Sequence, residues 1–168
     1  MLFNSLGFAL FFPVVFFLYW FVAKNNLKAQ NSILLFSSYF FYACWDYRFL
    51  FLLVFSTFLD YFTGIKIREA GTRTSKRVWL LISVIVNLGF LGFFKYYNFF
   101  VESFAEVMNS VGFKPDIWTL HIILPVGISF YTFHGMSYVF DIYNGKVVPR
   151  KNFVNYSVFV SYFPLLVA

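Results

Sequence analysis

LFNSLGFALFFPVVFFLYWFV, residues 2–22, is the stretch that decides the fold. It contains 21 residues and no charged side chain. At a rise of about 1.5 Å per residue, a helix of this length covers about 31 Å, which matches a hydrocarbon core of about 30 Å. No basic segment precedes it, and no cleavage site of small residues follows it before Lys24. We therefore predict a retained membrane-spanning helix and not a removed signal peptide.

The composition of the whole chain extends this prediction. Of the 168 residues, 61% are apolar, 26% aromatic and 12% charged, against about 45–50% apolar and about 25% charged in a soluble domain. The runs are apolar on every side, which excludes the alternating pattern of a transmembrane β-barrel. Because lipid offers no partner to an unpaired backbone, we predict an all-α fold, a polytopic transmembrane helical bundle of five to six spans.

Charged clusters divide the chain into six apolar runs. The second run is short for a bilayer, at about 23 Å, and it ends at the turn Asp46-Tyr47-Arg48. The sixth run reaches Ala168 without a charge or a stop signal, so we expect the chain to be the N-terminal part of one larger transmembrane domain. The predicted spans are residues 2–22, 31–45, 49–65, 78–100, 120–143 and an incomplete 153–168.

The placement of basic residues predicts the orientation. Ten of the 13 lysines and arginines follow the first, third and fifth runs, and three lie on the other side. Since cytoplasmic loops are enriched in Lys and Arg, we expect residues 66–77 and 144–151 inside, and Met1 and residues 101–118 outside. The net charge of +6 is then topogenic, which argues for a lipid bilayer as the partner and against nucleic acid.

Cysteine and histidine give no sign of a metal or redox site. Cys44 is the single cysteine, so it cannot form an internal disulfide, and neither a CxxC nor an HxxxH spacing occurs. We therefore expect no metal site in this chain. His121 lies at the outer edge of the fifth run and is expected at the membrane interface.

Four polar side chains in the fifth run share one helix face, which we call the polar seam. Tyr131, His134, Tyr138 and Asp141 are spaced by three, four and three residues, so they fall within about 80° of one another. We expect this face to meet the bundle interior or a watered cavity. Either the seam lines a passage or catalytic cavity, or it makes helix-to-helix hydrogen bonds worth about 0.6 kcal/mol each. His134 by itself fits a hydrogen-bonded interior residue better than a general base.

Two aspartates lie near the predicted cytoplasmic ends of their runs, Asp60 and Asp141. The same loops offer basic partners, namely Lys66, Arg68 and Lys146. Ion-paired anchoring is the first interpretation, because pairing costs less than isolation in a membrane. A part in handling protons or the acyl donor is the second. The chain contains no complete set of nucleophile, base and oxyanion donors.

Three stretches of the sequence resemble the membrane-bound O-acyltransferase (MBOAT) family. They are MLFNS at residues 1–5, SSYFFYACW at residues 37–45 and LPVGISFYTF at residues 124–133, the last continuing to Ser137-Tyr138 and Asp141-Ile142-Tyr143. Within the family they are most similar to the bacterial branch of alginate O-acetyltransferases and teichoic acid D-alanyltransferases. The resemblance covers essentially the whole chain.

The resemblance implies an O-acyltransferase of the bacterial cytoplasmic membrane. The donor would be a cytoplasmic acyl thioester such as acetyl-CoA, without a bound cofactor, and the acceptor an exopolysaccharide or cell-wall polymer outside. A periplasmic or extracellular acyltransferase is the implied partner protein. The family's essential histidine belongs to later helices, beyond Ala168, so no catalytic residue is expected here and the chain alone should be inactive. The rival is a non-enzymatic membrane protein, such as a small transporter or an assembly subunit.

Overall fold

The computed structural model describes residues 5–110 and 125–166. All regular secondary structure in these two ranges is helical, which confirms the all-α class. In chain order the elements are α1 (Leu6–Phe17), the π-helical turn η1 (Leu18–Val22), α2 (Leu27–Glu69), α3 (Arg73–Ser110), α4 (Ile128–Tyr143), α5 (Phe153–Ser161) and α6 (Phe163–Leu166).

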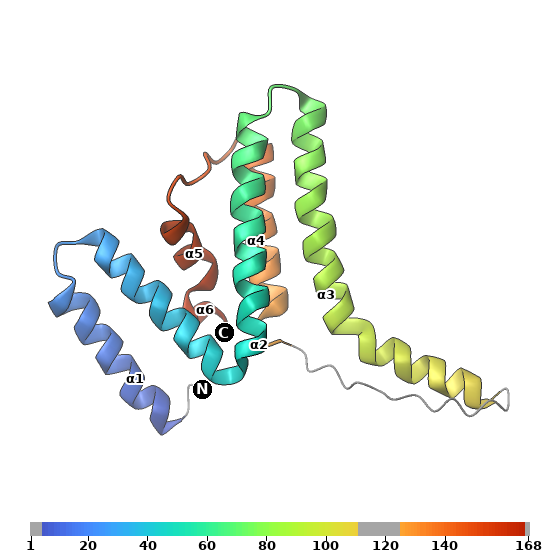
Figure 1. Ribbon diagram of the computed structural model, residues 1–168, viewed down its shortest axis with the longest axis horizontal. Coiled ribbons are helices and arrows are strands. Elements are labelled where there is room, and N and C mark those ends of the chain that lie inside the picture. Colours follow the sequence, from blue (N-terminus) through green and yellow to red (C-terminus); the bar gives the residue numbers. More distant parts are fainter. Residues whose placement is uncertain (1–4, 111–124, 167–168) are drawn as a thin grey trace.

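The first apolar run and the second form an antiparallel hairpin (Figure 1). The Ser5 hydroxyl caps α1 by accepting the Phe8 N–H at 3.3 Å. At the far end the chain reverses through Asn25, whose φ of 66° lies in the left-handed region that asparagine tolerates. The Asn26 side chain then caps α2 by accepting the Ala29 N–H at 3.1 Å. Side-chain caps therefore begin both helices of the hairpin.

The second and third runs form one bent helix, α2. Its bend lies at Asp46, where φ and ψ are −157° and 114°. The Asp46 carboxylate accepts the Arg48 backbone N–H at 2.9 Å and pairs with the Arg48 guanidinium at 2.8 Å. The predicted Asp46-Tyr47-Arg48 turn is thus a kink, because the side chains supply the partners that the interrupted helix lacks.

α2 is the central element and contacts α3, α4 and α5. Fully buried side chains of this core include Leu53 on α2, Val139 on α4 and Tyr156 on α5. A second cluster joins the hairpin to α6: the Phe163 ring lies 5.6 Å from Phe41 and 5.5 Å from Phe11, measured between centroids. The C-terminal helices therefore fill the angle of the α2 bend (Figure 1).

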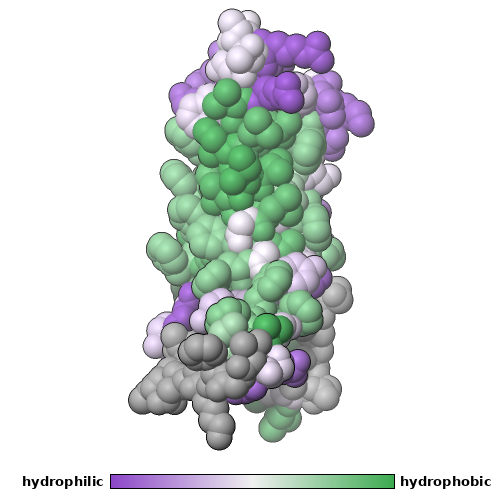
Figure 2. Space-filling view, turned by 90° about the vertical axis from the view of Figure 1, so that its right-hand side faces the viewer, coloured by the Kyte–Doolittle hydropathy of each residue, from purple (hydrophilic) through white to green (hydrophobic). Residues whose placement is uncertain are grey.

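The outer surface is that of a membrane protein. Two helical segments are long and apolar enough to cross a bilayer, α2 and residues 73–97 of α3, and the shorter helical stretches 6–22 and 153–166 are also apolar. Figure 2 shows a wide hydrophobic band on the α3 side, with hydrophilic residues gathered at the upper end. The structure is a helical membrane bundle, and the exact set of crossings stays a prediction.

The described part of the fifth predicted run, residues 125–143, begins with a turn and not with a helix. The described helix begins at Ile128, and Pro125 precedes it in a turn closed by a hydrogen bond from the Ile128 N–H to the Pro125 carbonyl at 3.3 Å. Residues 111–124 lie outside the described residues; they include His121 and residues 111–118 of the predicted outer loop 101–118.

Candidate functional site

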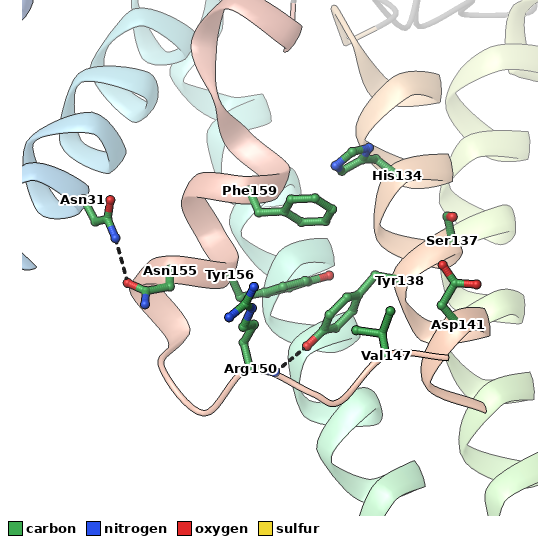
Figure 3. A pocket seen from close by; sticks show the side chains of 10 residues that line it. All are labelled: Asn31, His134, Ser137, Tyr138, Asp141, Val147, Arg150, Asn155, Tyr156 and Phe159. Atoms are coloured by element: carbon green, nitrogen blue, oxygen red, sulfur yellow. Dashed lines mark hydrogen bonds between the residues drawn. The ribbon is translucent and has the colours of Figure 1, made fainter. Parts of the chain in front are cut away.

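A half-open pocket of about 450 Å³ lies between α4, α5 and the start of α2 (Figure 3). Polar groups, aromatic rings and both signs of charge meet in it. Its lining residues are Asn31, His134, Ser137, Tyr138, Asp141, Val147, Arg150, Asn155, Tyr156 and Phe159.

α4 is positioned by the turn that precedes it. Gly127 has a φ of 74°, in the left-handed region that favours glycine. It also packs against the Leu166 backbone carbonyl so closely that a Cβ atom would collide with it. The Tyr42 hydroxyl of α2 donates to the Val126 carbonyl at 3.0 Å. Val126 and Gly127 therefore fix the start of α4 against α2 and α6.

Two hydrogen bonds join the segments that line the pocket. The Arg150 backbone N–H donates to the Tyr138 hydroxyl at 2.8 Å, which ties the 144–152 connection to α4. The Asn31 side-chain N–H donates to the Asn155 side-chain oxygen at 3.0 Å, which ties α2 to α5 (Figure 3). The pocket is thus built from segments far apart in the sequence.

Aromatic rings form the floor of the pocket. Tyr138 and Tyr156 lie 4.5 Å apart between centroids, and His134 lies 4.3 Å from the Phe159 ring. Among the described residues, neither His134 Nε2 nor the Tyr156 hydroxyl has a hydrogen-bond partner, although both atoms are buried. Such groups usually find a partner, so these two are available to a bound molecule or to water.

Charge lies at the mouth of the pocket. Asp141 is partly exposed and pairs with Lys146 at 3.9 Å, as the ion-pair interpretation predicted. Arg150 is exposed, and Figure 3 shows its side chain beside Tyr138 and Tyr156. The arrangement suits a ligand that carries a negative group at one end and hydrogen-bonding groups along an apolar stem.

The polar seam is only partly gathered in this pocket. His134, Tyr138 and Asp141 line it, whereas Tyr131 is buried on the α2 side, beside Tyr42. The most buried side of α4 runs instead through Tyr131, Gly135, Val139 and Ile142. The helical spacing predicted that the polar residues share one face of α4. It could not predict which face of α4 packs against α2.

The ion pair that was predicted for Asp60 is wrong. It is 1% exposed, and its carboxylate accepts the Ser83 hydroxyl at 2.6 Å and the Asn87 amide at 2.7 Å. The Ser56 hydroxyl completes this polar network by donating to Asn87 Oδ1 at 2.6 Å. Among the described residues, no basic side chain pairs with Asp60. Lys66 pairs with Glu69 instead.

α4 fits against this network through a glycine. A Cβ atom on Gly135 would collide with the Asp60 carboxylate. The network therefore links α2 to α3 by hydrogen bonds and to α4 by close contact. This network was not predicted from the sequence, although Ser83 and Asn87, four residues apart within an apolar run, are a signal of a shared polar face.

The arrangement provides binding groups more than a reaction centre. Among the described residues, no group of three or more His, Cys, Asp and Glu side chains could hold a metal ion. The pocket contains one imidazole, one carboxylate and one guanidinium, but no nucleophile paired with a base. It can position a polar ligand and hydrogen-bond it.

Comparison with known proteins identifies relatives of the chain. It is 42% identical over 160 residues to a probable alginate O-acetylase AlgI of Pseudomonas aeruginosa, and equally to that of Azotobacter vinelandii, with 95% of the chain covered. It is 35% identical, over its full length, to a peptidoglycan O-acetyltransferase of Helicobacter pylori.

The chain spans 30%, 31% and 36% of the lengths of these three relatives. No family model and no solved structure matches it. The resemblance stated from the sequence is confirmed: the chain is homologous to the N-terminal part of bacterial alginate and peptidoglycan O-acetyltransferases.

Proposed function

We propose that the complete protein carrying this chain is an integral membrane O-acetyltransferase, and that the chain forms its N-terminal part. The observation that carries this proposal is the 42% identity, over 95% of the chain, to proteins named alginate O-acetylase. The peptidoglycan O-acetyltransferase at 35% identity supports the same reaction with a different polymer. The acceptor in this proposal is a hydroxyl group of an exopolysaccharide or cell-wall polymer.

The proposed location is the bacterial cytoplasmic membrane, crossed several times, with the N-terminus outside. The distribution of basic residues supports this orientation. In Figure 1 the 70–72 and 144–152 connections lie at one end of the bundle, and the Asp46 bend and the end of α3 lie at the other. The proposal therefore places the pocket mouth, with Lys146 and Arg150, toward the cytoplasm.

The donor in this proposal is a cytoplasmic acyl thioester such as acetyl-CoA, taken up through the pocket as a substrate. A thioester of this type has a long chain with amide groups and ends in phosphates. The amides of Asn31 and Asn155 and the Ser137 hydroxyl can hydrogen-bond the amide groups of this chain, and the Arg150 guanidinium can bind a phosphate. Burial between Tyr156 and Phe159 would keep water from the thioester.

The chemistry then needs a base that this chain does not supply. The acceptor oxygen attacks the thioester carbonyl carbon and loses its proton to a base, while the carbon–sulfur bond breaks and the thiol leaves. The resemblance assigns this base to a histidine in later helices. His134 orients the donor in this scheme. An extracytoplasmic acyltransferase is the proposed partner protein of the complete enzyme.

A charge-matched pair of variants tests the pocket. Arg150 lines it, whereas the neighbouring Lys151 is exposed and does not. In a strain lacking the full-length gene, we expect Arg150→Gln to lower ester-linked acetyl groups on the envelope polymer several-fold. Lys151→Gln removes the same charge and should restore them fully. In vesicles, Arg150→Gln should raise the KM for acetyl-CoA more than it lowers kcat.

The outcomes separate the components of the proposal. Equal polymer acetylation in both variants, at equal levels of the protein in the membrane, would show that the donor does not bind in this pocket. A deletion strain with undiminished polymer acetylation would favour the non-enzymatic alternative. For the orientation, cysteines at Thr74 and Ser110 in a Cys44→Ser background can be exposed to an impermeant thiol reagent. Labelling of intact cells at position 74 and not at position 110 would contradict the proposed topology and support the opposite one.

A further inference from the structure

α3 is too long to serve only as a membrane span. Its 38 residues extend over about 57 Å, whereas a bilayer with its headgroups measures about 40–45 Å. A part of α3 within residues 73–97 is long and apolar enough to cross a bilayer. Figure 1 shows α3 bending near the end of this range, so that its last part runs away from the bundle axis. We call this last part, residues 99–110, the arm.

The arm is amphipathic. Phe100, Phe104 and Val107 fall within about 60° of one another around the helix axis, at about 100° per residue. Glu102 and Glu106 fall on the opposite face. The arm contains no lysine or arginine. One face of the arm therefore carries its two acidic residues, and the other face is mainly apolar, with Ser103 at its edge.

The apolar face of the arm is turned toward the membrane-spanning part of α3. Phe100, Phe104 and Val107 line one groove together with Gly92 and Phe93, which belong to the spanning part. This groove, of about 870 Å³, lies in the bend. Phe100 is 65% exposed and Phe104 57% exposed. Among the described residues, no other helix takes part in the lining of this groove.

The groove continues an apolar surface of the candidate membrane span. Phe93 also belongs to a second apolar groove, which runs along the span past Ile85 and Phe90. An apolar strip thus extends without interruption from the middle of the span to the arm. Water would have to cover a large apolar patch if the arm projected into solvent. Acyl chains on this side of the span would also reach the arm, because the two grooves share Phe93.

We infer that the arm is an interfacial helix that lies at the membrane surface, and that the groove in the bend takes the acyl chain of a phospholipid. The apolar face of the arm enters the acyl-chain region, and Glu102 and Glu106 face water. The orientation proposed above places this surface in the outer leaflet. Because the arm lacks basic residues, the interaction rests on apolar contact and not on anionic headgroups. The inference needs only the membrane-embedded fold and is independent of acetyl transfer.

Spin labels on opposite faces of the arm test this inference. Phe104→Cys and Val107→Cys carry the label on the apolar face, and Glu102→Cys and Glu106→Cys carry it on the acidic face, all in a Cys44→Ser background. The full-length protein is placed in vesicles of phosphatidylethanolamine and phosphatidylglycerol. We expect labels at 104 and 107 to collide with dissolved oxygen more than with a water-soluble nickel chelate, and the reverse at 102 and 106.

Each alternative gives a different pattern. Low collision rates with both reagents at 104 and 107 would show that protein covers the groove and would overturn the assignment to lipid. High rates with the nickel chelate on both faces would show an arm in water and would overturn it too. The expected pattern should persist in vesicles of phosphatidylcholine alone. Its loss there would contradict the apolar basis of the interaction.

Discussion

Two polar regions of the bundle differ in how their hydrogen bonds are satisfied. The Asp60 network is buried and its members bond to one another across α2 and α3. The pocket beside His134 is half open and leaves buried polar atoms without partners among the described residues. A satisfied network stabilises the fold, whereas unsatisfied groups in a pocket are available for a ligand.

The comparison predicts that changes in the network lower the amount of folded protein, and that changes in the pocket lower turnover at normal protein levels. Both regions involve α2 and α4, and the network adds α3 whereas the pocket adds α5. Single substitutions in the two regions test this division.

Asp60→Leu should have the largest effect. It leaves the Ser83 hydroxyl and the Asn87 amide without an acceptor in the interior, at a cost of about 1–3 kcal/mol for each group. We expect a strong loss of membrane-inserted protein and a lower midpoint of thermal unfolding in detergent. Asp60→Asn keeps an acceptor oxygen of the same reach and should fold nearly normally. Leu and Asn variants of equal stability would contradict the role of the network.

Gly135→Ala should come next. The added Cβ atom would collide with the Asp60 carboxylate, so α4 must shift, at a cost of about 1–3 kcal/mol. Gly89→Ala is the matched control, because its Cβ atom would have nothing within 4 Å. In a helix that control should be neutral or stabilising by up to about 1 kcal/mol. The thermal midpoints of the two variants decide the point, and a stable Gly135→Ala protein would rule out the close contact.

His134→Gln should have a moderate effect, and only on activity. Glutamine keeps a neutral hydrogen-bonding group but removes the titratable imidazole. We expect a loss of less than about tenfold in polymer acetylation, against about a hundredfold or more for removal of a general base. Membrane levels of the protein should be unchanged. Complete loss of transfer at normal levels would place the base within this chain.

The smallest effects are expected for Tyr138 and Tyr156, whose rings lie side by side. Tyr138→Phe removes the acceptor of the Arg150 N–H and should cost about 1 kcal/mol. Tyr156→Phe removes a buried hydroxyl that has no partner among the described residues, so stability should change by less than about 0.5 kcal/mol. If Tyr156→Phe lowers acetyl transfer without lowering stability, its hydroxyl binds the substrate. Equal stability loss in both variants would instead mean that water or later helices bond the Tyr156 hydroxyl.

Part of the candidate site was predictable from the sequence. His134, Tyr138 and Asp141 were candidates because polar residues at helical spacing stand out in an apolar run. Asn31, Arg150 and Asn155 were not predictable as pocket residues, since nothing local connects residues that meet only after three segments pack together. The Asp60 ion pair was wrong because nearness in sequence favoured Lys66, whereas α3 brings Ser83 and Asn87 closer in space.

The helical membrane class, the interruption at Asp46 and the resemblance to O-acetyltransferases were all predicted from the sequence alone. These follow from local quantities: the length of apolar runs, the residues that interrupt them and the motif that resembles the family. Only the tertiary structure decided which face of α4 is buried, which partners satisfy Asp60 and where the arm of α3 points. Such features depend on the packing of side chains from distant segments, and the periodicity of one helix carries no information about its neighbours.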